Sequence, residues 1–95
     1  MMATYDQWLE AYSLAYDAVP GPFDIACPHC GHRSLCLVFT GDPGRMVGYA
    51  HFWCANCLRG IGVSRTAIPD DAILRDIRQP PSSRQPMIPD YQLVR

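Results

Sequence analysis

Two short stretches, Cys27-Pro28-His29-Cys30-Gly31 and Cys54-Ala55-Asn56-Cys57, decide how this chain folds. Each contains a C-x-x-C pair, and the pairs are separated by the 23 residues numbered 31 to 53. One tight C-x-x-C turn directs two sulfurs at the same ion, so two such turns can supply the four thiolates of a tetrahedral site. The spacing therefore predicts one structural zinc ion whose ligands are Cys27, Cys30, Cys54 and Cys57.

The residues between the two pairs are expected to form a β-hairpin. Residues 34–40 are rich in strand formers, and residues 46–53 are expected to form the returning strand. Between them lies Gly41-Asp42-Pro43-Gly44, where the proline presets its own φ and the last glycine accepts a positive φ. Because the two limbs are nearly equal in length, the hairpin brings the two cysteine pairs together. Residues 58–66 are expected to add a third strand.

Both faces of this hairpin are apolar. Leu37 and Phe39 point to one face, whereas Cys36 and Val38 point to the other. A sheet that is apolar on both sides needs cover on both sides. We expect an N-terminal helix on one face, and either the C-terminal segment or a partner on the other.

Residues 1–22 are expected to form an amphipathic helix. Thr4 followed by Gln7 is a capping-box pattern, and Pro20-Gly21-Pro22 ends the helix. The apolar positions share one side of a helical wheel; they are Tyr5, Trp8, Leu9, Tyr12, Ala15, Tyr16 and Val19. This stripe is expected to pack on the rest of the protein, with a partner-binding face as the alternative.

Residues 67–95 are expected to form a short helix and a proline-rich tail. The helix is predicted from Asp70 or Asp71 to about Arg78, with an aspartate as its cap. The tail is expected to be extended or mobile, yet its apolar residues could dock on the chain's own sheet or on another molecule. Residues 1–22, 23–66 and 67–95 together make one structural domain.

Composition places the chain among small globular proteins. It has 95 residues, of which 48% are hydrophobic and 18% charged, and its net charge is −1. A core this small usually needs an additional stabilising element such as a metal site, and bound zinc can supply about 10–16 kcal/mol of folding energy. The near-zero charge argues against a general nucleic-acid coat protein. With no apolar run long enough for a membrane, no secretion signal and metal-type cysteine spacing, we expect a cytoplasmic protein without a membrane partner.

From Phe23 to Thr66 the chain resembles the zinc-ribbon class, whose members include domains of transcription factors, RNA polymerase subunits and ribosomal proteins. The resemblance rests on the paired knuckles and implies metal binding by the four cysteines. The expected fold class is therefore small α+β: a zinc ribbon, with a three-stranded antiparallel β-sheet, flanked by N-terminal and C-terminal helices.

Iron is the alternative metal, because rubredoxins also use paired C-x-x-C knuckles. The chain lacks the acidic surface of that family, and its second knuckle continues Leu58-Arg59-Gly60 without an immediate glycine. We expect one Zn²⁺ ion as the cofactor, with iron as a minor alternative.

The remaining residues leave three functions open. The first is an adaptor or accessory subunit that binds a protein partner. The second is a nucleic-acid-binding or transcription-associated ribbon that would use Arg33, Arg59 and Arg65 beside Tyr49, Phe52 and Trp53. The third, a rubredoxin-like electron carrier, is less favoured.

Enzyme activity is not expected, nor is a small-molecule substrate. The chain has no phosphate-cradling glycine loop and no nucleophile–base pattern, and four thiolates leave no open coordination position. The fifth cysteine, Cys36, is expected to be a small buried residue in a strand.

Overall fold

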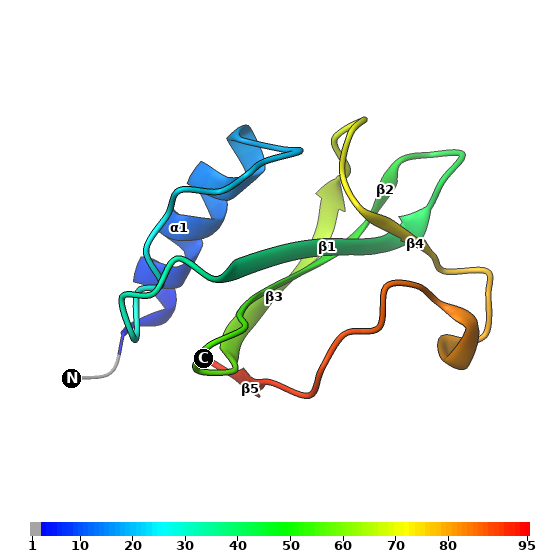
Figure 1. Ribbon diagram of the computed structural model, residues 1–95. Coiled ribbons are helices and arrows are strands. Elements are labelled where there is room, and N and C mark those ends of the chain that lie inside the picture. The colour runs from blue at the N-terminus through cyan, green and yellow to red at the C-terminus, as the bar shows by residue number, and fades with distance from the viewer. Residues whose placement is uncertain (1–2) are drawn as a thin grey trace.

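One α-helix packs on a five-stranded mixed sheet in residues 3–95, the part of the chain that the computed structural model describes (Figure 1). Residues 1 and 2 of the predicted N-terminal unit lie outside the described residues. The elements are α1 (Tyr5–Asp17), β1 (Leu35–Asp42), β2 (Val47–Cys54), β3 (Arg59–Ala67), β4 (Leu74–Asp76), the 3-10 helix η1 (Pro81–Ser83) and β5 (Gln92–Leu93). The strand order is β4-β1-β2-β3-β5.

Helix α1 begins as the sequence predicts. The backbone N–H of Gln7 donates to Thr4 Oγ1 at 3.2 Å, and the backbone N–H of Thr4 donates to Gln7 Oε1 at 2.9 Å. These reciprocal bonds satisfy two backbone donors that a helix start otherwise leaves without partners. Six residues of the predicted apolar stripe lie on α1 and are buried or pack against the core, whereas the seventh, Val19, packs against the core from beyond the end of the helix.

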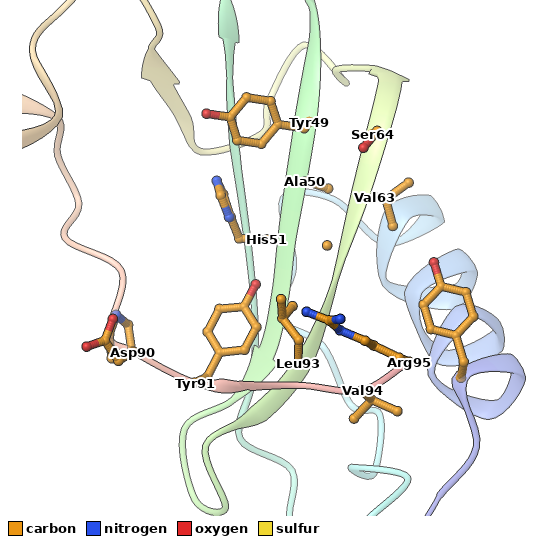
Figure 2. Close-up of a pocket in the computed structure, with 13 residues that line it drawn as sticks. Tyr49, Ala50, His51, Val63, Ser64, Asp90, Tyr91, Leu93, Val94 and Arg95 are labelled. Carbon is orange, nitrogen blue, oxygen red and sulfur yellow. The ribbon is translucent and has the colours of Figure 1, made fainter.

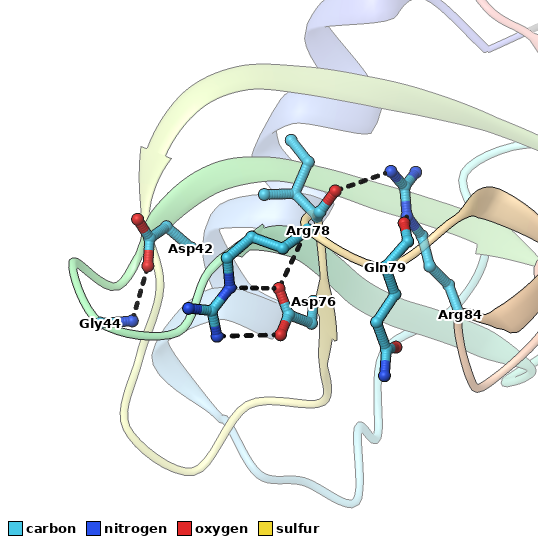
Figure 3. A network of polar contacts seen from close by, with 7 residues as sticks. Asp42, Gly44, Asp76, Arg78, Gln79 and Arg84 are labelled. Atoms are coloured by element: carbon cyan, nitrogen blue, oxygen red, sulfur yellow. Dashed lines mark hydrogen bonds and ion pairs between the residues drawn. The ribbon is translucent and has the colours of Figure 1, made fainter.

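The central hairpin joins β1 and β2 in an unbroken antiparallel register from Leu35↔Cys54 to Asp42↔Val47. Its loop is stabilised by Asp42, whose carboxylate accepts the backbone N–H of Gly44 at 2.7 Å (Figure 3). The positive φ expected at Gly44 occurs at Met46 instead, with φ 55°. The turn lies where the sequence places it, but a different residue takes the left-handed conformation.

The main core lies between α1 and the sheet. Phe52 from β2 and Trp8 from α1 pack in a T-shaped arrangement, with ring centroids 5.9 Å apart. Phe39 and Ile61, from β1 and β3, are fully buried in the same layer. Three adjacent strands thus present their apolar side chains to one helix face, as the two-residue period of a strand requires.

The predicted C-terminal helix is wrong. Residues 74–76 form β4, which pairs parallel with β1 in the register Phe39↔Leu74 to Gly41↔Asp76. An isolated helix of about eight residues is marginal in water. The edge of β1 offers backbone hydrogen bonds instead, since Phe39 N–H donates to Ile73 O at 2.8 Å and Ile77 N–H donates to Gly41 O at 3.0 Å.

A polar network holds the chain after β4 (Figure 3). The Arg78 guanidinium donates to both carboxylate oxygens of Asp76, at 3.1 and 3.0 Å, and holds the pKa of this carboxyl below its ordinary value. Arg84 donates to the carbonyl oxygens of Gln79 and Ile77, each at 3.0 Å. These contacts turn the chain away from β4 and into the tail.

The tail docks on the chain's own sheet. Two backbone bonds of 2.8 Å, from Gln92 N–H to Leu58 O and from Val94 N–H to Gly60 O, attach β5 in parallel to β3. The expected sheet of three antiparallel strands is therefore larger than predicted, because a short parallel strand adds to each edge.

Candidate metal centre

The four predicted ligands converge at one point. Their Sγ atoms all lie within 4.8 Å of one another, and the distances are 3.8 Å from Cys27 to Cys57 and 3.6 Å from Cys30 to Cys54. Sulfurs about 2.3 Å from a central ion at tetrahedral angles are about 3.8 Å apart. The cluster can therefore hold one metal ion, as the sequence predicts.

Both knuckles have the same local conformation, although their residues differ. In the first, Gly31 directly follows Cys30 and has a φ of 79°. In the second, Leu58 directly follows Cys57 and has a φ of 53°. Gly31 N–H donates to Cys27 O and Leu58 N–H donates to Cys54 O, both at 2.9 Å. The missing glycine of the second knuckle thus does not alter its turn, but a non-glycine residue with this φ is strained.

N–H groups support the sulfurs. The backbone N–H groups of His29 and Cys30 donate to Cys27 Sγ at 3.4 and 3.5 Å. The Asn56 side-chain amide donates to Cys30 Sγ at 3.5 Å. The backbone N–H of His32 is the main reason that the pKa of Cys30 falls to about 6. Donors aimed at sulfur favour the thiolate, the form that binds a metal.

The four cysteines of the tetrad are buried or half-buried. Cys54 is fully buried and Cys27 is 3% exposed, whereas Cys30 and Cys57 are half-buried. Four sulfurs complete a tetrahedral shell, and this donor set suits zinc and iron alike. A metal ion bound by all four sulfurs would have no open coordination position.

Cys36 lies outside the tetrad, on the sheet face that points away from α1. It stands opposite Trp53, and burial raises the pKa of its thiol. His51 stands opposite Val38, and its Nε2 lies 3.0 Å from Thr40 Oγ1. This hydrogen bond turns the imidazole toward Thr40.

The structure does not gather the three candidate nucleic-acid contacts into one surface. Arg33 is paired with Asp24 at 2.7 Å beside the first knuckle. Arg59 and Arg65 lie at opposite ends of β3, about 20 Å apart along the strand. Of the aromatic residues proposed beside them, Phe52 is fully buried and Trp53 is 6% exposed.

The structure has two grooves that the sequence did not predict. The first, here called the β1 groove, has a volume of about 360 Å³ and runs along the first half of β1, between Val19, Phe23, Ile73 and Met87. The second, the far-face groove, has a volume of about 670 Å³ and lies over β2 and β3 beside the tail. The glycine and serine at positions 62 and 64 were the available signal for the second groove, since they alternate with apolar residues along β3.

No helix in residues 3–95 is long and apolar enough to cross a membrane. Comparison with protein-family models, with curated proteins and with solved structures found no match for this chain.

Proposed function

We propose that this protein is a small zinc-stabilised adaptor that binds an extended apolar segment of a partner protein along β1. The β1 groove is the observation that carries the proposal. It combines an open strand edge with apolar walls, which are the two elements of recognition by strand addition.

The edge of β1 is only partly covered. β4 pairs with residues 39–41 alone, and Phe39 N–H points to β4, where it meets Ile73 O. Alternate residues of a strand direct their backbone groups to the same side. The N–H and C=O of Leu37 therefore point to the same edge, where no strand of residues 3–95 pairs with them. An added strand would find donors and acceptors there.

Apolar side chains flank this edge. Ile73 is 54% exposed and Met87 is 62% exposed, and both line the β1 groove with Val19 and Phe23. Pockets beside a strand edge receive alternate side chains of an extended peptide and give the interaction its specificity. An apolar segment fits these walls better than a charged one.

The zinc ion has a structural role in this proposal. Leu35, the first residue of β1, pairs with the ligand Cys54. A metal held by the tetrad would fix the open end of the hairpin, and with it the start of the β1 edge. The proposal gives the metal no catalytic task, because four sulfurs fill its coordination shell.

A capture experiment with charge-inserting variants tests this function. The tagged protein is incubated with lysate of its native host, with and without nuclease, and the bound material is identified. Wild type should retain a stoichiometric protein after nuclease treatment, and Ile73→Glu should lose it. Leu14→Glu is the matched control, because Leu14 is 56% exposed on α1 and does not line the β1 groove.

Each other outcome contradicts the proposal. Equal capture by Ile73→Glu would place the contact elsewhere, and loss of the bound material on nuclease treatment would favour the nucleic-acid function. Metal analysis of the same preparation should give one zinc per chain. A coloured preparation with iron would favour the electron carrier, since ferric thiolate absorbs visible light.

A further inference from the structure

The far-face groove exists because β3 carries no bulky side chains on that side. Gly62 and Ser64 face away from α1, whereas Ile61 and Val63 alternate with them and pack on the core. A Cβ atom added at Gly62 would meet nothing nearer than Ala50 O at 3.9 Å. The floor of the groove is therefore bare backbone with open space above it.

Aromatic side chains form one wall of this groove (Figure 2). Tyr49 and His51 project from β2, with ring centroids 5.1 Å apart and planes at 75°. Tyr91 enters from the tail and is fixed by a hydrogen bond of 3.3 Å from its hydroxyl to Ile61 O. Rings held by such contacts lose little further freedom when a ligand binds beside them.

His51 adds a polar side chain whose orientation and charge state are set by its surroundings. Its Nε2 lies 3.0 Å from the hydroxyl of Thr40, which is 1% exposed. Burial, helped by the charge of Arg75, lowers the pKa of His51 to about 4. The ring is therefore neutral at physiological pH, with one nitrogen as donor and the other as acceptor. Among the hydrogen bonds found in residues 3–95, that of His51 is made by Nε2 and none by Nδ1.

Two charged side chains of the tail line the groove. Figure 2 shows the Arg95 guanidinium reaching back over the strands close to Leu93, while Asp90 lies on the far side of Tyr91. The groove thus has a cationic group beside its flat floor and an aromatic wall. Its volume of about 670 Å³ is within the range of sites for small organic molecules.

We propose that the far-face groove binds a small planar aromatic molecule that carries an anionic group. The ring lies over Gly62 beside Tyr49 and Tyr91, and the anionic group pairs with Arg95. A guanidinium is suited to carboxylate and phosphate groups, which it binds through two parallel hydrogen bonds. The two grooves involve different residues, so this proposal stands or falls independently of the adaptor function.

The test uses two matched pairs of probes with the full chain. Adenosine monophosphate is compared with adenosine, and indole-3-acetate with indole, by calorimetric titration and saturation-transfer NMR. At least one of the two anions should bind the wild type, about fivefold or more tighter than its neutral counterpart. Arg95→Gln should remove most of this preference.

Filling the groove provides the decisive variant. Gly62→Leu has room for its side chain and should weaken binding by about tenfold or more. Ser82→Leu, at an exposed position of η1, is the matched control and should bind like the wild type. If Gly62→Leu loses its metal or its fold, the smaller Gly62→Val takes its place.

Three results would overturn the proposal. The first is that neither anion binds the wild type at millimolar concentration. The second is that the filled variant binds as well as the wild type. The third is that inorganic phosphate alone competes as strongly as the aromatic probes, since this would make the site a simple anion site at Arg95.

Discussion

Tyr91 stacks on Trp53, with ring centroids 5.6 Å apart and planes at 10° to each other. One residue belongs to the tail and the other to β2, immediately before Cys54 of the tetrad. The stacked pair attaches the tail to the sheet face that α1 does not cover. A sheet with two apolar faces thus obtains part of its second cover from its own chain, and the far-face groove stays open beside it.

Removing this stack should release the tail. Tyr91→Ala loses the aromatic pair and the bond to Ile61 O, and should lower the free energy of unfolding by about 2–4 kcal/mol. Tyr91→Phe keeps the stack and should cost only about 0.5–1.5 kcal/mol. Urea unfolding gives both values, and amide exchange in residues 92–94 reports the release. Equal costs for the two variants would show that the stack contributes nothing.

The metal tetrad should be indispensable to the fold. Cys54→Ser removes a fully buried ligand, so the protein should lose its metal and be largely unfolded at 25 °C. Cys36→Ser is the matched control, because Cys36 lies outside the tetrad, and it should keep one metal ion per chain. Circular dichroism and metal analysis measure the two effects. A folded, metal-free Cys54→Ser protein would refute the structural role of the metal.

Alanine substitutions at two glycines of β3 should have different effects on stability. The added Cβ at Gly60 would overlap the Phe52 carbonyl oxygen and the Trp53 backbone, whereas that at Gly62 meets only open space. Gly60→Ala should therefore cost about 1–3 kcal/mol, because the strands must move apart. Gly62→Ala should be neutral or stabilise by up to about 1 kcal/mol, since it restricts the unfolded chain. Thermal melts of the two variants test the contrast.

Acid should destabilise the native state through His51. Its pKa is about 4 in the folded protein and near 6.5 in an unfolded chain, so the unfolded state binds the extra proton first. The contribution is complete above about pH 6.5 and is lost as the pH falls from there through about 4. Unfolding free energies of wild type and His51→Gln, measured at each pH, should differ less as the pH falls. The comparison covers the pH values at which both proteins keep their metal, because loss of the metal would unfold both. A constant difference over this range would contradict the burial of a neutral imidazole.

The elements that the sequence predicts well are those with local patterns. The capping box at Thr4 places the start of α1, and the C-x-x-C pairs place the tetrad. The turn near Pro43, together with the nearly equal limbs, is sufficient to predict the hairpin between the tetrad's two halves. Each of these signals lies within a few residues of the structure that it specifies.

The edge strands could not be predicted in this way. Ile73, Leu74 and Ile77 follow an aspartate at a helical spacing, yet bonds from Phe39 and to Gly41 draw this segment into β4. Those partners lie 34 and 36 residues away in the sequence, and no periodicity encodes them. The far-face groove was missed for the same reason, because its wall at Tyr91 arrives from the tail.

The segment after β4 connects the two opposite edges of the sheet, from the β1 side to the β3 side (Figure 1). A single proteolytic cut between Ser83 and Pro89 would make β5 a separate peptide held by a two-residue strand and the Tyr91 stack. While tethered, such a strand has an effective concentration in the millimolar range, and the cut would abolish this advantage. The far-face groove would then lose Tyr91 and Arg95, whereas β4 and the tetrad would stay in place. Proteolysis after Met87 would thus remove the far-face groove irreversibly, whereas a cut before Met87 would also take that side chain from the β1 groove.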